Sequence, residues 1–235
     1  MQPSEHYRSL RGRITELVQG LSDEQLATVV PGCPQWSVRD LVSHLSALAA
    51  DVLSRAPERF AVAGLSMGGY CALEILRQAP ERVVALALVD SSARPDTPES
   101  KANREKQIDR ARTAYPALVD EVLPKWIHPS RLHEAEVGGV ARDMALDAGR
   151  KTFAWQQRAI MSRADSRPLL KAIACPTVVV CGAEDALIPM EVHEELARGI
   201  AGARLEVIPA CGHLAPLERP NEVADALRTW MRQLA

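Results

Sequence analysis

A glycine-rich stretch joins an apolar strand pattern to a helical one, and no other feature constrains the fold of this chain so strongly. Residues 60–63 (FAVA) have strand character, residues 68–79 read as a helix, and GLSMGG at 64–69 connects them. A serine at such a junction must turn sharply with strained backbone angles, so the residues two before and two after it must be nearly free of side chains. The pattern predicts a tight strand–turn–helix unit with Ser66 at its apex, although a plain glycine-rich turn would use the same letters.

Three more apolar runs follow, at residues 83–89, 177–181 and 204–208, and helical patterns at about 190–200 and 221–233 follow the last two. The run at 83–89 is almost wholly apolar, which is typical of a parallel strand covered on both faces. Strands that alternate with helices favour a doubly wound α/β sheet. We therefore predict an α/β core of about four parallel strands, formed by residues 48–94 and 166–235.

Residues 95–165 interrupt this alternation, because they are charged, helical in pattern and without a strand signal. An insertion between strands at the carboxyl edge of an α/β sheet is where a cover over an active site belongs. We expect a helical lid here. Residues 1–47 are expected to form a helical N-terminal segment. In that segment Pro31 to Pro34 form a break, and Ser37 is expected to cap a longer helix that runs to about residue 56.

The composition excludes several classes of partner. The net charge is −2, from 28 basic and 30 acidic residues, which argues against a nucleic-acid or membrane-surface partner. A basic cluster within residues 101–112 is interspersed with acids and reads as a solvated helix face. No apolar run is long enough to span a membrane. Five scattered cysteines without a CxxC pair favour reduced thiols and a cytoplasmic location.

The Ser66 hydroxyl would need a base to act as a nucleophile. Among six histidines, His213 is best placed, because it follows the fourth strand in CGHLAP and has the small Gly212 before it. A surface loop histidine is the simpler alternative. In this arrangement the backbone N–H of Met67, at the start of the helix, would point toward an oxyanion.

A base of this kind needs a carboxylate to orient it. Asp185 follows the third strand and is preferred, because the chain order serine–aspartate–histidine then has each residue after a strand. Its neighbour Glu184 is a substitute. Asp90, at the end of the second strand, is a weaker candidate that could instead cap the following loop.

From about residue 48 to 235 the sequence resembles the α/β-hydrolase superfamily, in particular its small lidded esterases and lactonases. The matching stretches are PERFAVAGLSMGGYCALEILRQAPERVVALALVD, SRPLLKAIACPTVVVCGAEDALIP and IPACGHLAPLERP. The resemblance implies a nucleophile at Ser66, an acid at Asp185 and a base at His213. It also implies a small ester, thioester or lactone as substrate, with no cofactor and no metal.

The chain departs from that family before the serine. Family members place four strands there, and the loop after the third donates the second oxyanion N–H, whereas the residues before Ser66 read as helices without an HGG-type turn. One alternative is therefore a catalytically impaired hydrolase-like protein. The departure also leaves one edge of the 60–63 strand without a partner, so we expect the N-terminal helices to cover it or two chains to pair there as a homodimer.

The first 46 or so residues resemble the N-terminal helices of DinB-like mycothiol-dependent maleylpyruvate isomerases, through LRGRITELVQGLSDEQLATVVPGCPQWSVRDLVSHLSAL. In that family the histidine that matches His44 is one of three metal ligands. Residues 128 and 133 are histidines on non-matching elements, and one histidine cannot hold an ion. His44 is therefore expected to be a helix-surface histidine, and a metal-dependent transferase or isomerase is disfavoured.

Overall fold

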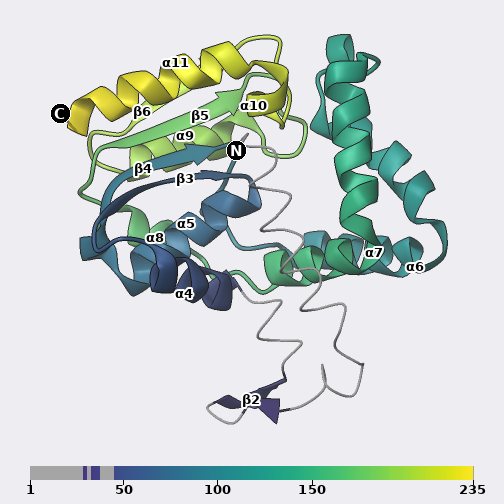
Figure 1. Ribbon diagram of the computed structural model, residues 1–235, viewed down its shortest axis with the longest axis horizontal. Helices are drawn as coiled ribbons and strands as arrows, with labels where there is room; N and C mark the ends of the chain where they lie inside the picture. Colours follow the sequence, from purple (N-terminus) through teal and green to yellow (C-terminus); the bar gives the residue numbers. More distant parts are fainter. Residues whose placement is uncertain (1–28, 31–32, 38–44, 235) are drawn as a thin grey trace. The chain divides into compact units, whose positions relative to one another are not determined.

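The structure, a computed structural model, describes residues 29–30, 33–37 and 45–234 (Figure 1). The chain divides into two compact units, Met1–Ser43 and His44–Ala235. In the first unit, β1 (Val29–Val30) and β2 (Cys33–Ser37) pair antiparallel. The prediction that Ser37 caps a helix is therefore wrong, because Ser37 ends a strand, while the predicted break at Pro31 to Pro34 lies partly outside the described residues. Pro31-Gly32 is a dipeptide that favours turns, and a turn serves a strand pair as well as a helix break. The other helices predicted before residue 45, and His44, lie outside the described residues.

The second unit contains the predicted parallel sheet. Its strands are β3 (Phe60–Leu65), β4 (Val83–Val89), β5 (Thr177–Gly182) and β6 (Arg204–Ile208), and they lie in the order β3-β4-β5-β6. All three neighbouring pairs are parallel. Consequently the four carboxyl ends lie at one edge of the sheet. The prediction of an α/β core with four parallel strands is confirmed.

Helices cover both faces of this sheet (Figure 1). Alternate residues of β4 and β5 face opposite ways: Leu86, Leu88 and Val179 pack in one apolar cluster with α5 (Met67–Gln78) and α9 (Met190–Gly199). Intervening residues such as Ala87 and Val178 pack in a second cluster with α11 (Pro220–Met231). The other helices of this unit outside residues 95–165 are α4 (Leu45–Arg55), η1 (Pro80–Arg82), α8 (Arg167–Leu170), α10 (Ala215–Glu218) and η4 (Arg232–Leu234).

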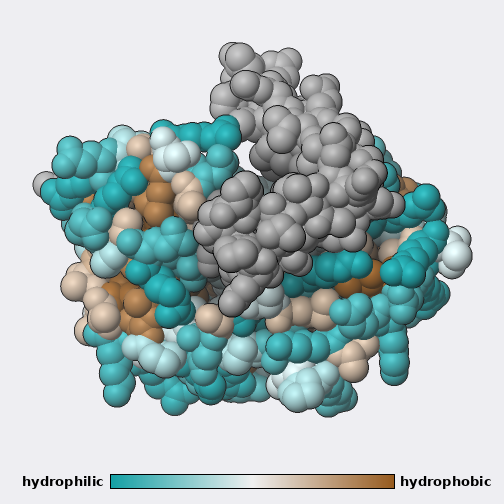
Figure 2. Space-filling model, turned by 90° about the horizontal axis from the view of Figure 1, so that it is seen from below, coloured by the Kyte–Doolittle hydropathy of each residue, from teal (hydrophilic) through white to brown (hydrophobic). Residues whose placement is uncertain are grey.

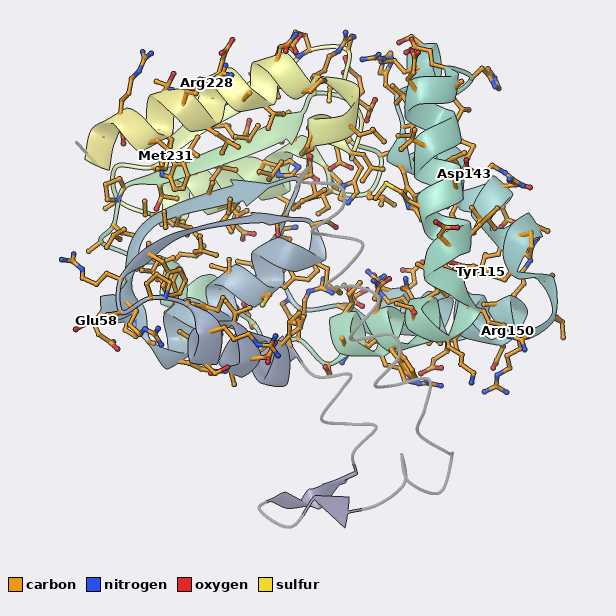
Figure 3. The ribbon with its side chains drawn as sticks, viewed as in Figure 1. Glu58, Tyr115, Asp143, Arg150, Arg228 and Met231 are labelled. Atoms are coloured by element: carbon orange, nitrogen blue, oxygen red, sulfur yellow. The ribbon has the colours of Figure 1, made fainter. Side chains whose placement is uncertain are left out.

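Residues 95–165, all of them described, contain no strand, as predicted. They form α6 (Pro98–Trp126), η2 (Pro129–Arg131), the π-helix η3 (Ala135–Gly139) and α7 (Val140–Met161), beyond the carboxyl ends of the strands in Figure 1. The helices α6 and α7 bend, at Ala114 and Gly149 respectively. Tyr115, labelled in Figure 3, holds α6 and α7 together, because its hydroxyl donates to the Ala145 carbonyl over 2.7 Å.

In the described part of the chain, few large apolar side chains are exposed. On the face that Figure 2 shows, hydrophobic residues form small patches between hydrophilic ones. Among the described residues, no helix is both long and apolar enough to cross a bilayer.

One edge of the sheet belongs to β3, whose only partner within the described part of the chain is β4. Ala61 and Ala63 are correspondingly exposed.

We predict that this β3 edge is covered in solution, either by the N-terminal segment or by a second copy of the chain, since an unpaired apolar edge invites pairing. The edge-facing amide hydrogens of β3 should then exchange slowly, at a rate comparable with those of β4. Hydrogen exchange combined with light scattering after size-exclusion chromatography measures both properties. A strict monomer with rapidly exchanging edge amides would contradict both forms of cover.

Candidate active site

Ser66 lies at the junction between β3 and α5, in the tight turn that the sequence predicts. Its φ of 51° and ψ of −112° place a residue with a side chain in a region that L-residues rarely adopt. Two hydrogen bonds hold this strained conformation. The Ser66 N–H donates to the Val89 carbonyl over 2.8 Å, and the Ser91 hydroxyl donates to the Ser66 carbonyl over 2.9 Å. Both partners come from the end of β4, so the neighbouring strand fixes the turn.

The glycines around Ser66 are constrained differently from the sequence prediction. A Cβ at Gly64 would lie 2.2 Å from the Gly68 carbonyl oxygen, and one at Gly69 would lie 2.1 Å from Ser91 Oγ. A Cβ at Gly68 would meet nothing within 4 Å. The expectation that both positions two residues from the serine must lack a side chain therefore holds at Gly64 and is wrong at Gly68. Before the serine, the backbone at the start of α5 leaves no room for a side chain at Gly64. After the serine, the position without room for a side chain is Gly69.

His213 contacts both of its predicted partners. Its Nε2 lies 2.8 Å from Ser66 Oγ, and its Nδ1 lies 2.7 Å from Asp185 Oδ2. The imidazole and the carboxylate are buried, whereas Ser66 is partly accessible. With Nδ1 donating to the carboxylate, Nε2 carries the lone pair that can accept the serine proton. Three loops from the ends of β3, β5 and β6 thus meet in one hydrogen-bonded chain.

Asp185 is held as an anion. Its Oδ1 accepts from the N–H groups of Leu187 (2.8 Å) and Ile188 (3.0 Å), so the acid loop folds back on its own carboxylate. Burial alone would raise the pKa of Asp185, but the N–H groups of His193 and His213 outweigh it and hold that pKa well below its usual range. Glu184 points elsewhere, since its Oε2 accepts from the Cys211 N–H over 3.1 Å.

Asp90 ends β4 in the left-handed region, with φ of 44°, and is fully buried. Its two oxygens accept from the N–H groups of Gly182 (2.9 Å) and Ala215 (3.2 Å). Asp90 thus ties the start of the acid loop to the start of α10, just after His213. These bonds do not reach the loop that follows β4, so they do not support the alternative that Asp90 caps that loop. Burial raises the pKa of Asp90 to about 7, with a smaller contribution from the charge of Asp185.

A third buried acid, Glu218, connects the histidine loop to the helices of residues 95–165. Its carboxylate accepts from the N–H of Gly212 (3.0 and 3.1 Å) and from the N–H of His128 (2.8 Å). In parallel, the N–H groups of His213 and Leu214 both donate to the Trp126 carbonyl, over 3.0 and 3.1 Å. His213 therefore lies on a loop fastened to the end of α6. Sequence reasoning missed Glu218; a charge amid the apolar residues after His213 is the only signal.

Asp90, Asp185 and His193 offer ligand atoms within 4.8 Å of one another, and all three are buried. Each carboxylate oxygen of this group already accepts a hydrogen bond from an N–H group. These oxygens are therefore engaged in holding the loops. His193 was also missed by sequence reasoning, because nothing in its α9 pattern distinguishes it from a surface histidine.

The raised pKa of Asp90 predicts an unusual pH dependence of stability. Its folded pKa of about 7 exceeds the ordinary value of 3.8, so the folded chain binds this proton more tightly than the unfolded chain does. Ionisation of Asp90 between about pH 4 and 7 should therefore lower the free energy of unfolding, by up to about 4 kcal/mol. Asp90→Asn should remove this slope, as measured by urea unfolding across that range. Equal slopes in the two proteins would contradict the prediction.

The comparisons with known proteins agree with the α/β fold. The sequence model of the Alpha/beta hydrolase family matches residues 7–226, so the match begins well before residue 48, where the sequence resemblance placed it. A pimeloyl-[acyl-carrier protein] methyl ester esterase from Neisseria meningitidis is 29% identical over 201 residues, which make up 82% of this chain and 62% of that enzyme. The chain thus spans less than two thirds of the length of that relative.

Solved structures are also similar. A thermophilic esterase from Thermogutta terrifontis has 36% identity and a TM-score of 0.75, covering 81% of this chain and 72% of that one. An enol-lactonase from Burkholderia xenovorans has 28% identity and a TM-score of 0.72, covering 80% of this chain and 73% of that one. The match over residues 7–226 shows that the chain belongs to the alpha/beta hydrolase family.

Proposed function

We propose that the protein is a serine hydrolase that cleaves a small carboxylic ester, thioester or lactone through an acyl-enzyme on Ser66. The observation that carries the proposal is the unbroken chain from Ser66 Oγ to His213 (2.8 Å) and from His213 to Asp185 (2.7 Å). Nucleophile, base and orienting acid are all within hydrogen-bond reach, which is the geometric requirement for this chemistry. The names of the esterase and lactonase relatives favour ester-type substrates.

In this mechanism the Ser66 oxygen attacks the carbonyl carbon while its proton passes to His213 Nε2. Asp185 stays ionised and stabilises the imidazolium, in keeping with its lowered pKa. The imidazolium then protonates the leaving alcohol or thiol, so the acyl group remains on Ser66. A water molecule next gives its proton to His213 and attacks the acyl carbon, which releases the acid and restores the serine.

The tetrahedral intermediates carry an oxyanion, and Met67 is the proposed donor to it. Met67 opens α5 directly after Ser66, and the first N–H groups of a helix have no carbonyl partner within that helix. The positive end of the α5 dipole adds to the attraction. We assign the Met67 N–H as one oxyanion donor, and the family resemblance assigns the other to a loop before β3.

We further propose that the α6–α7 segment, residues 95–165, acts as the lid of this site, with residues 48–94 and 166–235 as its catalytic core. The bends at Ala114 and Gly149 divide its helices into shorter pieces that can shift relative to one another. The clusters around Tyr115 and Leu123 provide the apolar interior that such a lid needs to move as a unit. A small molecule with apolar parts is the partner that this arrangement favours.

We predict that a fluorophosphonate probe will label the wild-type protein and that short-chain p-nitrophenyl esters will be turned over. Ser66→Ala should abolish both, because the bond-forming oxygen is removed. Ser54→Ala is the matched control, since Ser54 is exposed and its hydroxyl bonds only within α4, and it should retain both. Absence of labelling in folded wild-type protein would instead favour the catalytically impaired alternative.

A second pair of variants tests the identity of the acid. Asp185→Asn should lower kcat by roughly a thousandfold or more, because the base loses both its tautomer and its counter-charge. Glu184→Gln should leave kcat within about a fewfold of the wild type, since Glu184 contacts the Cys211 N–H and not the base. Steady-state kinetics on one ester decide between them. The reverse order of the two effects would assign the acid to Glu184.

A further inference from the structure

We propose that His193, a residue of α9 outside the chain from Ser66 to Asp185, is a positioning residue that holds the Asp185 carboxylate toward His213. This inference rests on the proposed function, because it assigns His193 a part in the same reaction. His193 makes its hydrogen bond to the Ile188 carbonyl and not to Ser66. It acts through the acid, so that Asp185 lies between two imidazoles.

The first step of the argument is the hydrogen bond that fixes the His193 ring. The side chain is fully buried, and its Nε2 lies 3.1 Å from the Ile188 carbonyl oxygen. A carbonyl only accepts, so this bond places the ring hydrogen on Nε2. The same Nε2 lies 3.6 Å from Asp185 Oδ2. That separation is too long for a hydrogen bond, but it brings the positive end of the N–H dipole close to the oxygen that accepts from His213.

The second step concerns the turn that carries the acid. Asp185 Oδ1 accepts from the N–H of Ile188, and the carbonyl of the same Ile188 accepts from His193. Asp185, Ile188 and His193 are therefore linked in series, and the last of them belongs to the first turn of α9. The start of this turn is held by bonds to Asp90 and Cys211, and the bond from His193 ties its end to a helix packed on the sheet. Such support is what keeps a catalytic side chain within the narrow range that turnover requires.

The third step concerns the other ring nitrogen of His193, Nδ1. With the hydrogen on Nε2, Nδ1 is a bare acceptor, and it is the one buried side-chain polar atom in the described part of the chain without a hydrogen-bond partner. An unsatisfied buried acceptor destabilises the folded state. An apolar ring of similar size would avoid that penalty but would leave the Ile188 carbonyl without its donor. The two effects oppose each other, so the net gain in stability from an imidazole at this position is small.

The experiment compares His193→Phe, His193→Gln and Leu196→Val. Phenylalanine keeps a ring but removes the N–H, and glutamine restores an N–H donor at the distance of Nε2. Leu196 is the matched control, because it is fully buried one turn along the same helix and packs in the apolar cluster, away from the acid. The measurements are kcat, KM and Tm, together with the far-downfield proton resonance of the bond between His213 and Asp185.

We expect His193→Phe to lower kcat by about tenfold or more at unchanged KM, with little change in Tm, because relief of the unpaired Nδ1 offsets loss of the bond to Ile188. The downfield resonance should weaken, and His193→Gln should recover most of kcat and of the resonance. Leu196→Val should show the opposite pattern, with a lower Tm and wild-type kcat. Wild-type kcat and an intact resonance in His193→Phe would overturn the inference, as would a loss of kcat that only follows a loss of Tm.

These outcomes are separate from failure of the proposed function. If the wild-type protein neither labels nor turns over ester, the proposed function fails, and the resonance alone then reports whether His193 orders the acid. If the wild type is active through Ser66 but His193→Phe matches it in kcat and resonance, the proposed function stands and the positioning role is wrong.

Discussion

The parallel register of β3, β4, β5 and β6 is the constraint on which the rest of the structure depends, because it brings four carboxyl ends to one edge. Ser66 follows β3, Asp90 ends β4, Asp185 follows β5, and His213 follows β6. The loops are then joined sideways by short bonds, such as those from Ser66 to Val89 and from Gly182 to Asp90. The sheet brings the loops close together, and the hydrogen bonds between neighbouring loops fix their geometry.

Much of this arrangement could be predicted from local signals. The apolar run at 83–89 and the glycine-rich junction at 64–69 are short-range features, and they predicted a strand at Val83–Val89 and a turn at Ser66 that the structure contains. Their order also indicated which loops would meet. The pairing at Cys33–Ser37 was missed, because a serine before an apolar helical stripe is a good local cap signal that ignores what lies before it.

The residues that sequence reasoning missed have one thing in common, which is that their significance depends on distant partners. Glu218 is significant because the N–H of His128 comes to it from 90 positions away, and Gly69 because Ser91 lies against it. His193 has the spacing of an ordinary helix residue, and only its burial beside the acid turn distinguishes it. Such relations arise from tertiary packing, which no local pattern encodes. The roles proposed for Ser66, His213 and Asp185 need the same relations, since only distances can show that they touch.

The attachment of the histidine loop to the Trp126 carbonyl has a consequence for how such a protein can diversify. A carbonyl oxygen is present whatever side chain the residue carries, so this attachment does not depend on the side chains of α6 and α7 as long as the backbone ends its helix at the same point. Insertions or deletions that shift the end of α6 would also displace His213. Exchange of the whole segment between relatives should therefore succeed only when the crossover preserves the path of the chain through residues 126–128.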